Sequence, residues 1–334
     1  MMKEFGFQWH ITNYCNLRCK HCYQNDFSMK EDLDTGTVID IIHKISDALK
    51  DCHISINITG GEPLLRKDLF DVLAVFEELN NIKEYNIITN ALPLTKESID
   101  KLERFPKFRQ YKISLEDVDL QRNDAIRGRG SFSKCMENYE LLKCYSEREK
   151  VFMFTLARYN YREVDAMLQF AMDNGADGVI LERFVPLGTG ALLREQCMKA
   201  DEWFAVLKDV IAFTRAQMEP EDLLPFKAFH IPSREGEEVK GAYCNLGDEA
   251  MALMPNGDVY PCRRFPVVIG NLLRDDFKEI VCKLGAFRHD IEKRLRGKCS
   301  VCLVDDCIGC RALVYALTGN LQDEDSQCIL KNSE

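Results

Sequence analysis

The N-terminal half of the chain alternates short β-rich runs with amphipathic helical stretches, and this alternation constrains the fold more than any other feature. Apolar residues in the helical stretches recur at three- and four-residue spacing, as in Val38, Ile41, Ile42 and Ile45. Strands are predicted at residues 7–12, 54–59, 85–89, 111–115, 151–156 and 178–181. Helices are predicted between them at residues 35–50, 68–79, 95–104, 133–145 and 161–174. Six βα units in one direction predict a parallel α/β sheet, either open and doubly wound or curved into a partial barrel. In both folds, functional residues gather at the carboxyl ends of the strands.

The regular alternation of strands and helices is not predicted to continue in the second half of the chain. A helix is predicted at residues 200–218, and the stretch 220–241 is interpreted as an irregular linker or lid. The remainder is rich in cysteine, with a hairpin predicted around Asn256 and Gly257 and short helices at 275–282 and 311–318. We therefore expect a large α/β domain followed by a smaller one.

Charge and hydropathy argue against two classes of partner. The 334-residue chain carries a formal net charge of −10, which disfavours nucleic acid because phosphate binding requires a basic surface. No apolar stretch approaches the roughly 20 residues that cross a bilayer, and the N-terminus lacks the apolar core of a signal peptide. We therefore expect a cytoplasmic protein with no membrane span.

The chain contains fifteen cysteines, and they are unevenly placed. Three lie between residues 15 and 22, and eight lie between residues 244 and 328. A reducing cytosol disfavours structural disulfides, so clustered cysteines indicate metal binding or catalysis. The remaining cysteines are expected to pack as small apolar side chains; they are Cys52, Cys135, Cys144 and Cys197.

Three thiols follow directly after the first predicted strand, where Cys15, Cys19 and Cys22 form a CxxxCxxC pattern. Three thiolates on one loop can hold three irons of a [4Fe–4S] cube and leave the fourth iron open. The open iron can bind the amino and carboxylate groups of a methionine moiety, and electron transfer into the adjacent sulfonium then releases a carbon radical. The alternative is a structural zinc site completed by His21 or by a distant ligand.

A Thr-Gly-Gly-Glu-Pro segment at residues 59–63, at the end of the second strand, gives an independent signal. Its glycines allow the backbone to approach a ligand closely, and Glu62 or an exposed carbonyl can receive an ammonium group. Together with the CxxxCxxC pattern, this segment resembles the radical SAM superfamily over residues 7–188. The resemblance implies a partial (β/α)6 TIM-like barrel that reductively cleaves S-adenosylmethionine (SAM).

The resemblance also implies which residues contact SAM. They are His21, Gly60, Gly61, Glu62, Pro63, Asn90, Ser114, Glu116, Arg127 and Leu187. His21 stands where the family prefers an aromatic ring beside the adenine, and Ser114 and Glu116 resemble a ribose- and carboxylate-contacting position. Arg127 or Arg129 can pair bidentately with the SAM carboxylate. Alternatively, either arginine is a solvated charge in the polar loop 122–130.

A second cysteine pattern lies near the C-terminus. It consists of Cys244, Cys262, Cys299, Cys302, Cys307, Cys310 and Cys328. Seven thiols are too many for one tetrahedral zinc ion, and two iron–sulfur clusters fit the count better. The pattern resembles the SPASM extension of radical SAM enzymes, which carries auxiliary [4Fe–4S] clusters, although its last two gaps are each one residue shorter.

The SPASM resemblance implies two sets of ligands. The outer cluster takes Cys299, Cys302, Cys307 and Cys328, and the inner cluster takes Cys244, Cys262 and Cys310. The inner set is one thiolate short, so its fourth position is open to substrate or solvent; Cys282 is an alternative ligand, although its apolar helical run favours plain burial. A further alternative is that only one auxiliary cluster assembles. The expected domains are a radical SAM barrel at 1–190, a helical bridge or linker at 191–240 and a SPASM domain at 241–334.

Two classes of substrate are compatible with these resemblances. Residues 7–24 resemble radical SAM/SPASM maturases of ribosomally made peptides, which form thioether or carbon–carbon crosslinks or epimerise residues. Residues 310–320 resemble haem-pathway enzymes that oxidatively decarboxylate porphyrin propionates. We favour the peptide, with its leader recognised by a separate protein or by the barrel itself, and a reductant such as flavodoxin or ferredoxin. A non-enzymatic electron-transfer or zinc scaffold protein explains the cysteines but not the open CxxxCxxC site.

Charged residues near these motifs leave several roles open. Arg263 and Arg264 follow Cys262, where sulfatase-maturing relatives have an aspartate base. Paired arginines can hold a carboxylate of a peptide acid or a propionate; alternatively, they pack over the cluster or pair with surface acids. No general base is assigned, although Asp117 and Glu182 lie near predicted strand ends and Tyr260 lies in the hairpin.

Overall fold

A mixed eleven-stranded sheet organises the part of the chain that the computed structural model describes, residues 3–234, 238–244, 246–247 and 249–330. Its strands are β1 Lys3–His10, β2 Cys52–Thr59, β3 Ile82–Thr89, β4 Phe108–Leu115, β5 Glu149–Leu156, β6 Gly178–Arg183, β7 Ala228–Pro232, β8 Lys240–Ala242, β9 Ala250–Leu253, β10 Asp258–Tyr260 and β11 Gly270–Asn271. They lie in the order β11-β10-β9-β1-β2-β3-β4-β5-β6-β7-β8.

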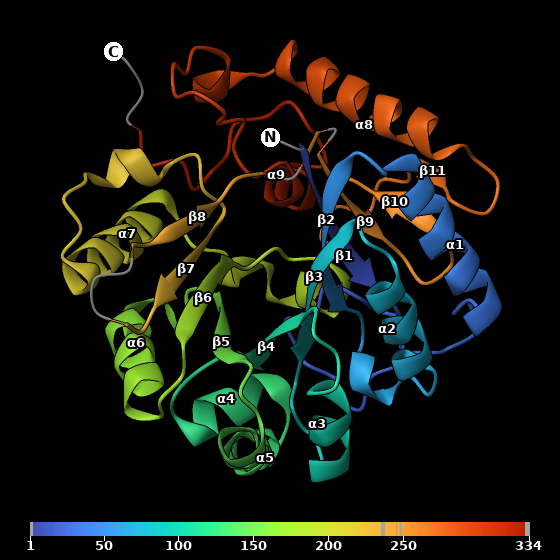
Figure 1. The fold of residues 1–334 in the computed structure, drawn as a ribbon. Helices are drawn as coiled ribbons and strands as arrows, with labels where there is room; N and C mark the ends of the chain where they lie inside the picture. Colours follow the sequence, from blue (N-terminus) through green and yellow to red (C-terminus); the bar gives the residue numbers. More distant parts are fainter. Residues whose placement is uncertain (1–2, 235–237, 245, 248, 331–334) are drawn as a thin grey trace.

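The central strands β1 to β6 are parallel and neighbour one another in sequence order, as consecutive βα units predict. The helices between them are α1 Thr35–Ala48, α2 Leu69–Glu78, α3 Lys96–Leu102, α4 Leu120–Arg127, α5 Ser131–Tyr145 and α6 Val164–Asp173. Figure 1 shows these helices around the outside of a curved sheet. The predicted partial (β/α)6 barrel is therefore confirmed.

Helix α1 illustrates how the sequence produces this packing. Asp34 caps its N-terminus by accepting a hydrogen bond from the backbone N–H of Thr37. Its apolar residues at three- and four-residue spacing, among them Val38, Ile41 and Ile45, are buried in the main core together with apolar side chains of the strands. The local periodicity thus fixes which face of the helix meets the sheet.

The stretch 220–241, predicted to be an irregular linker or lid, instead extends the sheet. After helix α7 Ala200–Thr214, strand β7 pairs antiparallel with β6, and β8 pairs antiparallel with β7. Phe229 and Ile231 alternate with less buried neighbours and enter the main core. This alternation spans only one short strand, which is too little to be distinguished from a loop by pattern alone. Residues 235–237 of the stretch lie outside the described residues.

The C-terminal strands extend the other side of the sheet. Strand β9 pairs parallel with β1, and β10 pairs antiparallel with β9, which confirms the hairpin predicted around Asn256 and Gly257. Helix α8 Phe277–Glu292 is longer than the predicted helix at 275–282, whereas α9 Arg311–Thr318 matches its prediction. Within the described ranges, no helix has the length and apolar character needed to cross a membrane.

Candidate functional site

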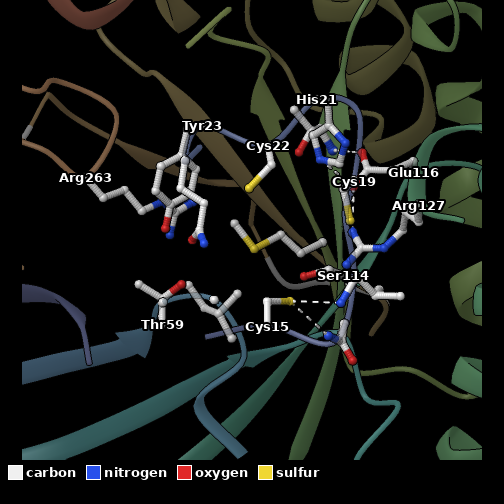
Figure 2. A pocket seen from close by; sticks show the side chains of 18 of the residues that line it. Cys15, Cys19, His21, Cys22, Tyr23, Thr59, Ser114, Glu116, Arg127 and Arg263 are labelled. Atoms are coloured by element: carbon white, nitrogen blue, oxygen red, sulfur yellow. Dashed lines mark hydrogen bonds and ion pairs between the residues drawn. The ribbon is translucent and has the colours of Figure 1, made fainter. Parts of the chain in front are cut away.

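A cavity at the carboxyl ends of strands β2 to β6 contains the thiols of Cys15, Cys19 and Cys22. It encloses about 900 Å³ of space that protein atoms do not fill, part of which is open to solvent. Figure 2 shows the three cysteines around this space, with Ser114 and Arg127 on its wall. The CxxxCxxC loop therefore lies where a parallel α/β fold places its functional groups.

The loop after β2 holds the cysteine loop on one side. Gly61 donates its backbone N–H to Thr12 O over 2.7 Å, and Glu62 donates its backbone N–H to Tyr14 O over 2.8 Å. A Cβ atom on Gly60 would meet Thr12 O at 2.5 Å, and one on Gly61 would meet backbone atoms of residues 13 and 14. The two glycines line the cavity, but the close approach that requires them is to the cysteine loop.

A second glycine loop, after β6, holds the cysteine loop on the other side. Gly190 donates its backbone N–H to Cys22 O over 2.9 Å, and the Thr189 hydroxyl donates to Cys19 O over 3.0 Å. A Cβ atom on Gly190 would meet His21 O at 2.7 Å. Of this region, the sequence resemblance implied only Leu187, as a SAM contact. Leu187 precedes the loop and lines a neighbouring cavity instead of the one around the thiols.

Glu62 does not face the cavity, contrary to the role predicted for it. Its carboxylate is fully buried and accepts hydrogen bonds from the Thr89 hydroxyl (2.7 Å), the Asn90 backbone N–H (2.7 Å) and the Leu64 backbone N–H (3.2 Å). Burial raises the pKa of Glu62 to about 7. The carboxylate thus ties the glycine loop to the end of β3, and neither it nor Pro63 lies on the cavity wall.

Glu116 joins two predicted site residues in a buried network. One carboxylate oxygen lies 2.8 Å from Arg127 Nη1 and 3.0 Å from His21 Nε2, and the other accepts from the Thr155 backbone N–H over 3.2 Å. Arg127 is the last residue of α4, in a segment predicted to be a loop, and its side chain is buried on the cavity wall. Arg129, the alternative, is exposed. The helix therefore selects Arg127 for the cavity.

Burial opposes ionisation of the three thiols. It raises the pKa of Cys15 to about 11 and that of Cys22 to about 12, and it also raises the pKa of Cys19. The charge of Arg127 acts in the opposite direction on all three. Metal coordination deprotonates a thiol outright, and three thiols on one loop with a free wall opposite them fit an iron–sulfur cube with an open corner.

A second group of thiols surrounds a smaller cavity of about 400 Å³ of unfilled space in the C-terminal region. It is lined by Cys299, Cys302, Cys307 and Cys328, the set predicted for the outer cluster. Cations contact this set: Lys227 Nζ lies 3.5 Å from Cys307 Sγ, and Arg311 Nη2 lies 3.8 Å from Cys299 Sγ. A ring of thiols with cationic neighbours fits a cluster that carries net negative charge.

The cavity of the outer set is closed by a buried ion pair. Arg183 Nη1, from the end of β6, lies 3.1 Å from Asp325 Oδ2, and both side chains are almost fully buried. The same oxygen accepts the backbone N–H of Cys310 over 2.8 Å. The pair therefore joins the barrel to the cysteine-rich tail between the two predicted ligand sets.

The inner set, Cys244, Cys262 and Cys310, is close enough that the charges of the other two act on Cys244. Cys282, the alternative ligand, is instead exposed on α8, so the prediction that it is buried is wrong. It lines neither the cavity that Cys244 lines nor the cavity of the outer set, and its role as a ligand stays a prediction. Cys144, expected to be buried, is also exposed, whereas Cys135 is buried as expected. In the parts of the chain described, no three His, Cys, Asp or Glu side chains are placed as ligands of a single metal ion.

The inside of the barrel forms a larger cavity, which we call the lumen, with about 1890 Å³ of space that protein atoms do not fill, part of it open to solvent. The lumen lies between the β7–β8 and β1–β9 sides of the sheet, and Ile88, Met153, Glu182 and Arg263 line both it and the cavity around the N-terminal thiols. Lys112 of β4 also lines the lumen; nothing in the sequence pattern indicated this, because a lysine on a strand is usually solvated.

Arg263 and Arg264 are already paired inside the protein. Arg263 Nη2 lies 2.7 Å from Glu182 Oε2, and Arg264 Nη1 donates to the backbone oxygen of Arg183 over 2.7 Å. Both arginines are largely buried. They therefore do not form the free carboxylate clamp considered from the sequence, and their acidic partner is an internal one.

Comparison with known proteins places two family descriptions on the chain. A model described as the radical SAM superfamily matches residues 9–171. A model named SPASM, described as an iron–sulfur cluster-binding domain, matches residues 244–308. The first match includes the CxxxCxxC loop. The second includes five of the seven cysteines of the C-terminal pattern, from Cys244 to Cys307, and ends before Cys310 and Cys328.

Several characterised proteins are similar to this chain. The AdoMet-dependent heme synthase of Methanosarcina barkeri is 28% identical over 97% of this chain and 95% of its own length. The antilisterial bacteriocin subtilosin biosynthesis protein AlbA of Bacillus subtilis is 27% identical over 81% of this chain and 58% of its own length. The crystal structure of Streptococcus suis SuiB bound to precursor peptide SuiA matches with a TM-score of 0.70 at 17% identity, over 99% of this chain and 77% of that chain, which shows a shared fold.

Proposed function

We propose, from the premise that this chain belongs to the radical SAM superfamily and carries a SPASM domain, that it abstracts hydrogen from an unactivated C–H bond of a ribosomally made peptide. The chain is an enzyme, and its cofactors are SAM and [4Fe–4S] clusters. The division at about residues 190 and 240 into barrel, bridge and SPASM domain is part of the proposal.

The observation that carries the proposed radical chemistry is the convergence of three thiols on one cavity. We assign Cys15, Cys19 and Cys22 as ligands of the SAM-binding cluster, which supplies the electron that cleaves SAM to a 5′-deoxyadenosyl radical. Arg127 offers the remaining N–H groups of its guanidinium to the SAM carboxylate, while Glu116 holds it in place from behind. Asn90 and Ser114 lie on the same wall and are proposed polar contacts.

The C-terminal cysteines are proposed to hold auxiliary clusters. The outer set has four thiols, so its cluster would be fully ligated by protein. The inner set has three, and Cys244 among them lines the lumen, so these thiols would hold a cluster beside the lumen and leave one of its irons without a ligand from this set. Oxidative radical chemistry leaves an electron to dispose of, and the cations around the outer set, Lys227 and Arg311, favour a more reduced cluster there.

The peptide substrate is supported by the strand that borders the lumen. Strand β8 is the last strand of the sheet in the described residues, and its three residues line the lumen. An edge strand can add an extended peptide by backbone hydrogen bonds. Gly6, Gly241 and Ala250 also line the lumen, and such small side chains leave room for a second backbone. The similarity to a bacteriocin biosynthesis protein points in the same direction.

Oxidative decarboxylation of porphyrin propionates is the second candidate function. It is favoured by the similarity to a heme synthase that extends over nearly the whole of both chains. Both candidates require the same radical step, and they differ in what occupies the lumen.

The radical step is tested with anaerobically reconstituted protein. The native protein should bind roughly eight to twelve irons and form 5′-deoxyadenosine when reduced with SAM. A triple Cys15→Ala/Cys19→Ala/Cys22→Ala variant should form none and keep the absorbance of the auxiliary clusters, whereas Cys144→Ala should behave as the native protein. Absence of 5′-deoxyadenosine from the native, fully loaded protein would disprove the proposed activity.

The substrate is tested by mass spectrometry with the same preparation. A short peptide encoded beside this gene should lose two hydrogens, as crosslinking requires, or gain deuterium from solvent if a residue is epimerised. A porphyrin bearing propionates should remain unchanged. Loss of carbon dioxide from the porphyrin, with no change in the peptide, would replace the first candidate with the second.

A further inference from the structure

Lys112 places an ammonium group inside the lumen without a carboxylate partner. Its Nζ donates to the side-chain oxygen of Asn57 over 2.6 Å. Among the residues that the structure describes, no carboxylate lies within ion-pair distance of this nitrogen. Glu182, whose charge acts on it most strongly, is instead paired with Arg263 at 2.7 Å. An ammonium has three donors, so the amide leaves two of them for another group.

The surroundings of Lys112 make this arrangement costly in the empty protein. Desolvation is the largest effect, and it lowers the pKa of Lys112 to about 8. Lys112 is partly buried, and a cation withdrawn from water is normally paired or hydrogen-bonded to an anion. The lumen is large enough to admit a ligand that provides such an anion.

The position of Lys112 relates it to the cavity around the N-terminal thiols. Lys112 precedes Ser114 by two residues on β4, so both side chains point to the inner face of the sheet. Ser114 lines the cavity of the thiols, and Lys112 lines the lumen. Two residues of a strand span about 7 Å, so a group bound to Lys112 lies roughly one layer of side chains below that cavity.

We propose that Lys112 binds a carboxylate of the substrate and thereby sets which C–H bond reaches the radical. The inference rests on the proposed function, because it takes the substrate to occupy the lumen. A carboxylate can come from an acidic residue of a peptide or from a propionate of a porphyrin, and the chemistry of recognition is the same. Arg263 and Arg264, the other cations considered for this role, are already bonded to internal oxygen atoms.

Several other charged groups surround the Lys112 ammonium. Glu84 of β3, Glu149 of β5 and Glu182 of β6 act on its ammonium by their charge, as does Arg263. The lumen is also lined by charged or titratable side chains of the remaining elements; these are Glu4, His230, Lys240, Tyr243, Cys244, Glu249, Arg288 and Asp306. Lys283 is exposed on α8 and does not line the lumen, so it provides a matched lysine control.

Isothermal titration of the reconstituted holoenzyme tests the proposal. The probes are the peptide acetyl-Ala-Glu-Ala-amide, its glutamine counterpart, and a porphyrin with free propionates. The native protein should bind the glutamate peptide or the porphyrin, and Lys112→Met should weaken that binding about 10- to 100-fold, as loss of one charge-assisted hydrogen bond predicts. Lys112→Arg and Lys283→Met should retain it. Which acid binds identifies the source of the carboxylate.

The pH profile provides a readout that a merely structural role would not change. Between pH 7 and 9, binding to the native protein should weaken as Lys112 loses its proton. The Lys112→Arg variant should stay charged, so its affinity should not change over this pH range. Equal affinities of native protein and Lys112→Met, identical pH profiles of native protein and Lys112→Arg, or no binding of either acid would overturn the proposal. Formation of 5′-deoxyadenosine by the native protein is measured separately, so failure of the proposed activity is distinguished from failure of the carboxylate site.

Discussion

Replacing Gly61 with alanine tests whether the glycine loop after β2 acts by holding the cysteine loop. A Cβ atom at this position would lie 2.6 Å from Asn13 O and still closer to the backbone of Tyr14. Real Cβ contacts are longer, so the two loops must separate. Separation breaks the hydrogen bonds from Gly61 N to Thr12 O and from Glu62 N to Tyr14 O, which measure 2.7 and 2.8 Å.

The expected magnitude follows from these two bonds. Each buried polar group left unsatisfied costs about 1–3 kcal/mol, so the native position of the cysteine loop loses about 2–6 kcal/mol. That loss exceeds the 1.4 kcal/mol that corresponds to a tenfold change in an equilibrium. We therefore expect Gly61→Ala to lose most of the roughly four irons of the N-terminal cluster, to form at least tenfold less 5′-deoxyadenosine, and to keep its auxiliary clusters.

The assay combines iron analysis, electron paramagnetic resonance of the reduced protein and SAM titration. Gly6→Ala is the matched control, because a Cβ atom there would meet Ala250 Cβ at an ordinary 3.7 Å. If Gly61→Ala kept full iron content but bound SAM weakly, the glycine would serve the ligand and not the cysteine loop. Native iron content together with native SAM binding would refute both explanations.

Three further predictions concern buried charge, acid stability and the auxiliary ligands. Arg183→Met should lower the free energy of unfolding by about 3–5 kcal/mol, because Asp325 remains buried without its cation; thermal unfolding measures this. His10 is fully buried, with a pKa lowered from 6.5 to about 3, mainly by desolvation, so the unfolded state takes up a proton that the folded state refuses. Native stability should therefore fall by about 1.4 kcal/mol more than that of His10→Gln between pH 7.5 and 5.5, as measured by denaturant unfolding. Cys262→Ala should lose auxiliary-cluster absorbance, whereas Cys282→Ala should retain it, because Cys282 is exposed on α8.

Each of these predictions has an outcome that contradicts it. Arg234 forms an exposed ion pair with Asp177, so Arg234→Met should change stability by less than about 1 kcal/mol, and an equal effect of both arginine variants would rule out the buried pair as the cause. An unchanged acid slope in His10→Gln would show that another group takes up the proton. Loss of auxiliary iron from Cys282→Ala would restore Cys282 as a ligand.

The sequence alone predicted the central strands and the position of the CxxxCxxC loop after the first of them. Strand and helix periodicities are local, and a continuous apolar run, such as residues 151–154 of β5, is enough to identify a buried strand. The CxxxCxxC loop could be placed after β1 because its residues are consecutive. Local patterns failed where the element was short, as in β7, or polar, as in α4, whose buried residues are only Asn123 and Arg127.

The tertiary structure decided which distant groups meet. Pairing of β8 with β7 brings Cys244, which follows β8 by two residues, to the lumen, and Arg127 at the end of α4 lines the thiol cavity while Arg129 stays exposed. The curvature of the sheet also places Lys112 in the lumen, although a lysine on a strand is expected from the sequence to face solvent. A residue's own neighbours determine its strand or helix, but its charge partners depend on how the sheet closes, and that closure is set by contacts between segments far apart in the chain.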